Sequence, residues 1–271
     1  MKVRSIAHWI AALILCVAPA ALAQKIAIPP DADGAAAALK DSPRHGEYVN
    51  LDLEGSDVKL KTFVAYPERS DKAPVVILIH EIFGMTDWTN AAADALAKEG
   101  FIVVAPDLIS GVEGAAENPR EAISKLTPEE TLKRLNAALK YGKSLPSATG
   151  KIGCVGFCYG GRTAFAYAAE QPELNAAVVY YGNAPETASL AKITCPVQGH
   201  FGGDDNRVNS TLPAAQEEMK KLGKVLDVNI YEGAGHGFLR QQDGQDGANL
   251  KASEQAWSKT VTFFKEHLEA K

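Results

Sequence analysis

The chain has 271 residues, of which 46% are hydrophobic and 23% are charged, and its formal net charge is −5. Even without its first two dozen residues it is long enough for one large domain with a substantial core. The negative charge and the lack of a basic cluster argue against a nucleic-acid partner.

The first residues, MKVRSIAHWIAALILCVAPAALAQ, show the three parts of a secretory signal peptide. Lys2 and Arg4 form a basic start, an apolar run follows, and Ala-Leu-Ala at 21–23 is a small-x-small cleavage site. The apolar run is short for a membrane span, which needs about 20 residues, so we favour cleavage over a membrane anchor. We therefore expect residues 1–23 to be removed and residues 24–271 to form one exported domain. The product is predicted to be secreted or periplasmic, monomeric and not membrane-bound.

Two segments of alternating apolar and polar residues come next, YVNLDLEG at 48–55 and VKLKTFVAYPE at 58–68. This alternation is typical of half-buried antiparallel strands and predicts an N-terminal antiparallel hairpin. The later strand-like runs are short and largely apolar, which suits parallel strands covered on both faces. They lie at 74–80, 100–108, 150–157, 175–182 and 195–202, and one more follows at 227–233.

Helical patterns separate these runs, at 87–100, 127–145, 161–171, 210–223 and 253–270. In the last of them, Trp257, Val261, Phe264 and Leu268 fall on one helical face. Strands and helices therefore alternate along the chain. This order predicts an α/β fold with a mostly parallel central sheet and helices on both faces.

The sequence Gly156-Phe157-Cys158-Tyr159-Gly160 has the pattern glycine, any residue, nucleophile, any residue, glycine. It lies between a strand-like run and a helical one, which is the context that a nucleophile elbow needs. Side chains at the flanking positions would crowd such a sharp turn. The positive end of the following helix would favour a reactive thiolate at Cys158. The alternative is a glycine-rich turn around a buried cysteine, and the context favours the nucleophile.

A nucleophile needs a base, and the base needs a carboxylate that orients it. His236 lies in EGAGHGF, a glycine-rich loop after the last predicted strand, where this kind of scaffold supplies its base. His80 and His200 end strands and could support the site, His267 is expected on the surface, and His45 has no clear role.

For the carboxylate, Asp204 and Asp205 compete in the loop HFGGDDNRV. Hydrolase loops at this place usually read G-x-x-D-x-x-V, which Gly202, Asp205 and Val208 match. We therefore predict Asp205, with Asp204 as its neighbour or a loop cap. The resulting order is cysteine, aspartate, histidine, as expected on this scaffold.

An early strand ends in HEIFG at 80–84. A backbone N–H in such a loop usually forms half of an oxyanion hole, and the residue after the nucleophile supplies the other half. This nominates the amides of Ile82 and Tyr159. Glu81 is unusual there, because a nearby carboxylate disfavours a thiolate by charge repulsion.

Five motifs in this order, HEIFG, VVAPDL, GFCYGG, GGDDNRV and GHGFLR, resemble those of the dienelactone hydrolases (carboxymethylenebutenolidases), a family with the α/β-hydrolase fold. The resemblance implies a Cys158-His236-Asp205 triad and a glutamate, Glu81, that contacts the resting cysteine. It also implies two arginines that grip a substrate carboxylate. Arg240 matches one of them, with a role only on the surface as the alternative. Arg120 is the only arginine in the segment expected to supply the other, but its local sequence matches poorly.

The leading hypothesis is therefore a lactone or ester hydrolase with a covalent cysteine intermediate and no metal or organic cofactor. A general exported esterase or thioesterase is the alternative within enzymes. From a different class, the protein could bind ligands without catalysis, or Cys158 could sense peroxide. Cys154 and Cys195 lie in apolar, strand-like runs and are predicted to be buried, unreactive thiols.

Overall fold

The computed structural model describes residues 26–269 of the chain. The predicted signal peptide, residues 1–23, lies outside the described residues. Within residues 26–269, no helix is both long enough and apolar enough to cross a lipid bilayer.

An eight-stranded sheet forms the centre of the molecule, with strand order β1-β2-β4-β3-β5-β6-β7-β8. β1 pairs antiparallel with β2 and β2 with β4, and all later pairings are parallel. The predicted antiparallel hairpin and mostly parallel sheet are therefore confirmed. The strands are β1 (Gly46–Asp52), β2 (Lys59–Ala65), β3 (Ala73–Ile79), β4 (Ile102–Pro106), β5 (Ala148–Phe157), β6 (Ala176–Tyr180), β7 (Val197–Gly202) and β8 (Leu226–Tyr231).

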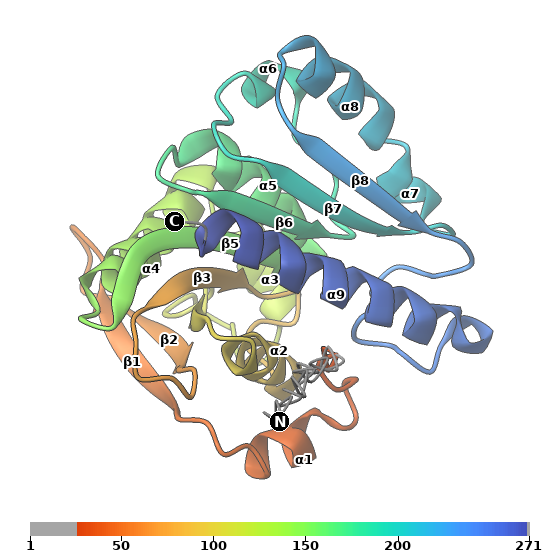
Figure 1. Cartoon of the computed structure of the whole chain (residues 1–271). Helices are drawn as coiled ribbons and strands as arrows, with labels where there is room; N and C mark the ends of the chain where they lie inside the picture. Colours follow the sequence, from red (N-terminus) through yellow and green to blue (C-terminus); the bar gives the residue numbers. More distant parts are fainter. Residues whose placement is uncertain (1–25, 270–271) are drawn as a thin grey trace, which may run out of the picture.

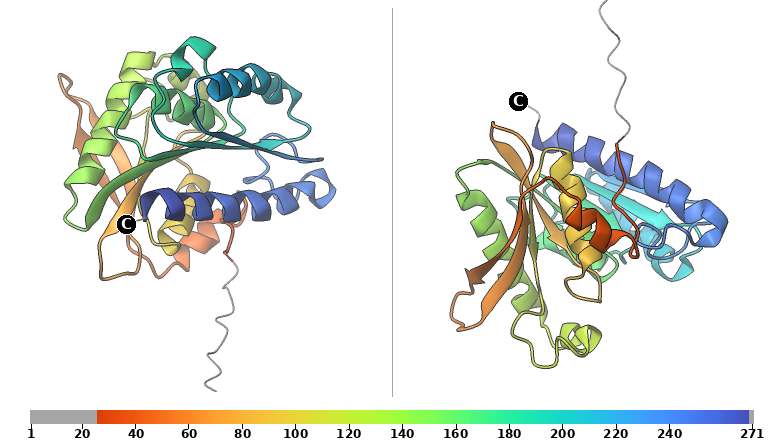
Figure 2. Two further views of the ribbon diagram at one scale, coloured as in Figure 1. Left: turned by 45° about the horizontal axis from the view of Figure 1, so that its top comes forward. Right: turned by 90° about the horizontal axis from the view of Figure 1, so that it is seen from below.

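Helices cover both faces of this sheet, as predicted (Figures 1 and 2). The long helices are α2 (Asp87–Lys98), α4 (Pro128–Ser144), α5 (Tyr159–Glu170), α8 (Leu212–Lys221) and α9 (Ala248–Leu268). The short ones are α1 (Ala35–Lys40), α3 (Pro119–Ser124), α6 (Thr187–Leu190), α7 (Asn206–Asn209) and the 3₁₀ turn η1 (Gln245–Gly247). The short helices were not predicted, because one or two turns are too short to show a helical period.

Two hydrophobic clusters hold the layers together. One joins a face of the sheet to α4, α5 and α8, and the other joins the opposite face to α2 and α9. All seven residues of β3 are buried, which explains why its sequence is continuously apolar rather than alternating. Thr86 and Thr127 cap α2 and α4 by accepting hydrogen bonds from the amides of Thr89 and Glu130.

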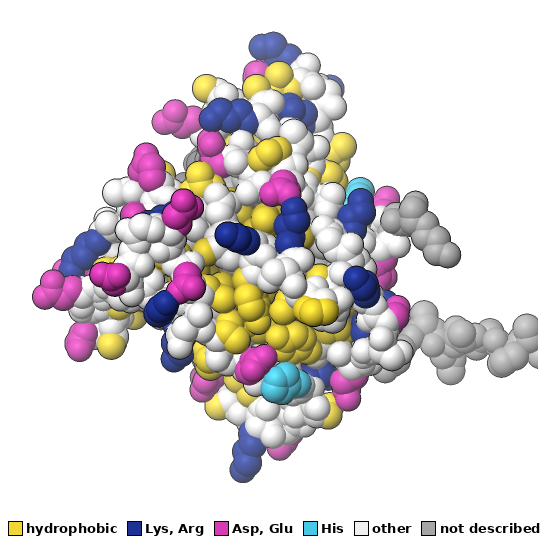
Figure 3. Space-filling view, turned by 90° about the vertical axis from the view of Figure 1, so that its left-hand side faces the viewer, with side chains coloured by type: hydrophobic (Ala, Val, Ile, Leu, Met, Phe, Trp, Pro, Cys, Tyr) yellow, Lys and Arg dark blue, Asp and Glu magenta, His cyan; other side chains and the backbone are white. Residues whose placement is uncertain are grey.

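The outer surface carries charges of both signs. Figure 3 shows one face, on which an apolar area is surrounded by interspersed lysine, arginine, aspartate and glutamate side chains. Positive and negative side chains are mixed on that face, and neither sign of charge forms a separate patch there.

Candidate active site

Cys158 sits at a strained turn between β5 and α5. Its backbone angles are φ 55° and ψ −110°, and it is the residue immediately before the helix. A Cβ atom at Gly156 would lie 1.9 Å from the carbonyl oxygen of Gly160, and one at Gly160 would lie 2.1 Å from that of Ile79. Both approaches involve backbone that cannot move aside. The two glycines are therefore required by the geometry of the turn.

The structure brings three of the predicted site residues into one chain of contacts. Cys158 Sγ lies 3.1 Å from His236 Nε2, and His236 Nδ1 lies 2.5 Å from Asp205 Oδ2. Because a carboxylate only accepts hydrogen bonds, Nδ1–H donates to Asp205 and leaves Nε2 to exchange a proton with sulfur. Asp205 is buried whereas Asp204 is exposed. The histidine thus meets Asp205, not its neighbour.

These contacts set the charge of the imidazole. Burial disfavours its charged form, but the hydrogen bonds and charges of Asp205 and Cys158 outweigh burial and raise the pKa of His236 to about 9. At neutral pH the ring is therefore protonated in the resting protein. A protonated ring at this position can give a proton to a leaving group.

Glu81, which the resemblance implied to contact the resting cysteine, pairs with an arginine in the structure. Glu81 is 4% exposed, and its carboxylate pairs with Arg240, whose Nε lies 2.8 Å from Oε2. Arg240 Nε has no hydrogen-bond partner among the described residues, so this contact is electrostatic. The hydrogen bond of Cys158 Sγ goes to His236 rather than to Glu81.

Burial controls the protonation of Glu81. It raises the pKa of Glu81 to about 6, although the charges of Arg240 and His236 act in the opposite direction. The carboxylate is thus ionised at neutral pH but close to titrating. The guanidinium of Arg240 also stacks over the ring of Phe83, 4.8 Å from its centroid.

The two nominated oxyanion-hole amides belong to the right elements. Tyr159 is the first residue of α5, where an amide has no partner within the helix, and Ile82 lies in the loop after β3. Within residues 26–269 neither N–H has a hydrogen-bond acceptor among the loop and turn contacts. Both donors are therefore available to a ligand.

His80 supports the loop that carries Ile82. Its Nε2 accepts a hydrogen bond from the amide of Leu108, so its Nδ1–H donates to the carbonyl oxygen of Glu81, 2.6 Å away. Burial lowers the pKa of His80, which keeps the ring neutral. A supporting position was one of the possibilities that the sequence left open for His80.

The other histidines lie away from the sulfur. His200 is buried and contacts Tyr231 and Thr260, and burial lowers its pKa to about 3. His45 is exposed, and His267 packs against Phe263 on α9. Of the described histidines, His236 is the one whose ring meets Cys158.

Arg120 is not brought to the site by any observed contact. It is exposed on α3, and no hydrogen bond or ion pair of its side chain occurs among the described residues. Arg240 is the arginine that reaches the buried carboxylate.

Tyr181 is a site residue that sequence reasoning missed. It follows β6 with a positive φ of 38°, is fully buried, and its ring packs edge-on against His236 with centroids 5.2 Å apart. Its hydroxyl has no hydrogen-bond partner within the described chain. The one available signal was its place at the carboxyl end of a strand, next to the elbow.

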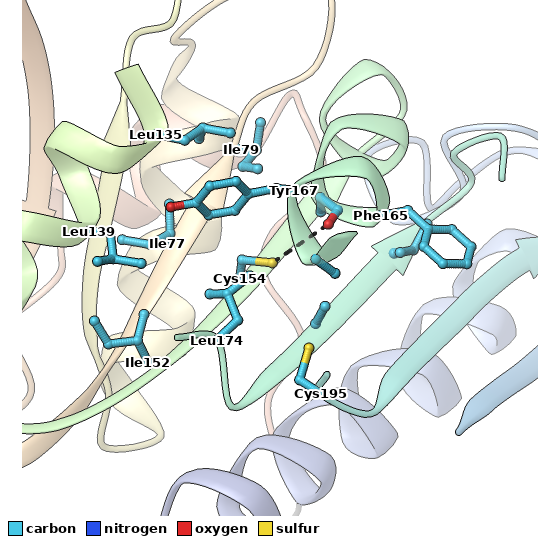
Figure 4. Packing of buried hydrophobic residues seen from close by; sticks show 14 of the residues in the cluster. Ile77, Ile79, Leu135, Leu139, Ile152, Cys154, Phe165, Tyr167, Leu174 and Cys195 are labelled. Carbon is cyan, nitrogen blue, oxygen red and sulfur yellow. Dashed lines mark hydrogen bonds between the residues drawn. The ribbon is translucent and has the colours of Figure 1, made fainter. Parts of the chain in front are cut away.

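The other two cysteines of the described chain are buried. Figure 4 shows Cys154 and Cys195 among apolar side chains of the core. Burial raises the pKa of both thiols, in the case of Cys195 to about 11. Neither forms a disulfide, so the sequence-based expectation of buried thiols agrees with their position.

The chain is similar to proteins of the dienelactone hydrolase family in sequence and in fold. The family model described as "Dienelactone hydrolase family" matches residues 60–268. A Methylorubrum extorquens protein, whose name assigns it provisionally to the carboxymethylenebutenolidases, is 27% identical over 229 residues, which are 78% of each chain. A crystal structure of a dienelactone hydrolase from Anabaena variabilis has a TM-score of 0.65 and 21% identity, and the match covers 83% of this chain and 99% of that one. A Pyrococcus horikoshii acylaminoacyl peptidase shares the fold, with a TM-score of 0.69, 15% identity and coverage of 88% and 44%.

Proposed function

We propose that this protein, which belongs to the dienelactone hydrolase family and hydrolyses ester or lactone bonds, acts through a covalent intermediate. In this intermediate the acyl group of the substrate is held as a thioester on Cys158. The observation that carries this proposal is the continuous contact from Cys158 Sγ through His236 to Asp205, at 3.1 and 2.5 Å. In this arrangement the imidazole can take and return the proton that the reaction needs.

The reaction has two halves. In the first, the sulfur of Cys158 attacks the acyl carbon, and the amides of Ile82 and Tyr159 stabilise the negative oxygen. The carbon–oxygen bond then breaks, and protonated His236 gives its proton to the departing alkoxide. For a lactone, this alcohol remains attached to the same molecule.

In the second half, neutral His236 removes a proton from water, and the resulting hydroxide attacks the thioester carbon. The carbon–sulfur bond breaks, the acid leaves, and the thiolate and protonated imidazole are restored. Asp205 keeps the ring in the required tautomer and stabilises its charged form throughout.

Arg240 is the group that we propose to hold a carboxylate of the substrate. The Arg240 side chain is partly exposed, with 23% of it accessible, although its Nε is buried beside Glu81. A guanidinium that stacks on Phe83 and faces one buried carboxylate can bind a second one. Arg120, which is exposed and without observed contacts, remains the weaker candidate for a second cation.

The test is turnover of p-nitrophenyl acetate and of dienelactone by the purified protein and by Cys158→Ala. We expect activity in the parent that is lost in Cys158→Ala and retained in Cys195→Ala, a matched control at a buried thiol. Turnover that survives Cys158→Ala would contradict the thioester. Inactivity of the parent on a wider panel of lactones and simple esters would favour ligand binding or thiol sensing.

We also propose export of the protein, which rests only on the basic start, the apolar run and the cleavage site at the N-terminus. Cell fractionation and N-terminal sequencing test this. An exported chain that begins at Gln24 supports the proposal, and an intact chain in the cytoplasm contradicts it.

A further inference from the structure

Residues 26–41, here named the strap, precede the part of the chain that the family model matches, which begins at residue 60. Part of the strap nevertheless packs against the rest of the domain. Pro29 and Ala35 are buried, and Ile26, Ile28 and Leu39 pack against the hydrophobic cluster shared by α2 and α9. The right-hand view in Figure 2 shows α1 beside α2, with the rest of the strap running past it.

One side of the strap is tied to the loop that follows the candidate base. The amide of Ala32 donates to the carbonyl oxygen of Arg240 at 3.0 Å. The side chain of Gln242 donates from Nε2 to the carbonyl oxygen of Pro29 at 2.8 Å and also to that of Leu239. The backbone from which the Arg240 side chain leaves is therefore held by the strap.

The other side is tied to α2, which follows the Glu81 loop. Trp88 donates from Nε1 to the carbonyl oxygen of Pro30 at 3.1 Å, and its ring packs edge-on against Phe157, the residue before Cys158. Beyond the strap, Arg44 binds Asp94 of α2 through two nitrogens, at 2.9 and 2.5 Å. The N-terminal segment thus contacts the Arg240 loop on one side and, on the other, the helix that follows the Glu81 loop.

We propose that the strap is a positioning element for substrate selection: it fixes the separation of the Glu81 and Arg240 loops, and so aims the guanidinium at the carboxylate of an anionic ester or lactone. This inference rests on the proposed function and adds the segment that orients Arg240. Recognition of a carboxylate by a guanidinium depends on geometry, so a small displacement of the Arg240 backbone weakens binding of anionic substrates selectively.

The test uses the full mature protein and two substrates that differ by one charge, 4-nitrophenyl hydrogen adipate and its methyl ester. The variant Ala32→Pro/Gln242→Ala removes both hydrogen bonds between the strap and the Arg240 loop, because it deletes the Ala32 N–H donor and the Gln242 Nε2 donor. Gln241→Ala is the matched control, because Gln241 is the exposed neighbour of Gln242 and its side chain makes no observed hydrogen bond within the described residues. Circular dichroism checks that each protein is folded.

We expect the double variant to lose about fivefold or more in kcat/KM for the anionic ester relative to the neutral one, through a higher KM, as the loss of one or two hydrogen bonds implies. The control retains the parent ratio. If the double variant does not fold, Gln242→Ala alone is expected to show a smaller shift in the same direction.

An unchanged substrate ratio would overturn the inference, because a segment with only a structural role lowers turnover of both esters equally. That result would leave the proposed function intact, since the parent would still show Cys158-dependent turnover. A parent protein without Cys158-dependent turnover of either ester would instead contradict the proposed function itself.

Discussion

Replacement of Glu81 by glutamine is expected to stabilise the folded protein at neutral and higher pH. The pKa of Glu81 rises from its ordinary value of 4.5 to about 6 in the folded state, chiefly because the carboxylate is buried. Each pKa unit corresponds to about 1.4 kcal/mol, so the ionised carboxylate costs about 2 kcal/mol of folding free energy above pH 7. This cost already includes the attraction of Arg240 and His236.

The pH dependence follows from the direction of the shift. Below about pH 4.5 the carboxyl is protonated in both the folded and the unfolded chain, so its full contribution to stability is present. That contribution is lost as the pH rises through about 6, where the folded protein must ionise a buried group. Glutamine imitates the protonated form at every pH. The stability difference between Glu81→Gln and the parent is therefore near zero at pH 4 and about 2 kcal/mol at pH 8.

Urea unfolding, followed by circular dichroism between pH 4 and pH 8, measures this difference. Glu232→Gln is the control, because Glu232 is an exposed carboxylate on the loop after β8. It is expected to change stability by less than about 0.5 kcal/mol. A Glu81→Gln protein that is no more stable than the parent at pH 8 would refute the reasoning, and so would a difference that does not change with pH.

Two further substitutions test the proposed triad and the turn that carries its nucleophile. Asp205→Asn removes the carboxylate that receives Nδ1–H, so we expect kcat to fall by about 10⁴-fold. We also expect NMR titration to give a lower pKa for His236 than in the parent, because Asp205 is one of the groups that raise it. An equal effect of Asp204→Asn, at the exposed neighbour, would contradict the assignment. Gly160→Ala places a Cβ atom 2.1 Å from the carbonyl oxygen of Ile79, so we expect a loss of about 3 kcal/mol or more in the free energy of unfolding. Gly55→Ala is the control, because Gly55 has a positive φ of 67° but open space around it. We expect its free energy of unfolding to fall by only about 1 kcal/mol. Similar losses in the two variants would contradict the claim that crowding at the elbow requires glycine.

The strands could be predicted because the pattern of apolar residues in each one depends on whether one or both of its faces are buried. β3 is buried along its whole length and reads as an unbroken apolar run, whereas β1 is exposed on one side and alternates. The order of the strands in the sheet could not be predicted from the sequence in this way. β4 lies between β2 and β3, and nothing local to residues 102–106 specifies that long-range pairing.

The site residues were predictable where chemistry demands a residue type at a fixed place. Asp205 could be chosen over Asp204 from its loop spacing, and the structure places Asp205 against His236. The partner of Glu81 was not predictable in this way, because its pairing with Arg240 depends on the relative position of two loops about 160 residues apart. Tyr181 was missed because aromatic residues at strand ends usually serve the core, and only the packed structure shows its ring against His236.

The most direct test of the account is to trap the acyl group on the protein. The parent and Cys158→Ala are mixed with p-nitrophenyl acetate, quenched in acid within the first turnover, digested and mapped by mass spectrometry. We expect one acetyl group in the parent, on the peptide that contains Cys158, and none on the corresponding peptide of the variant. Product release without any acylated Cys158, or an acetyl group carried by a different residue at the rate of turnover, would contradict the thioester mechanism.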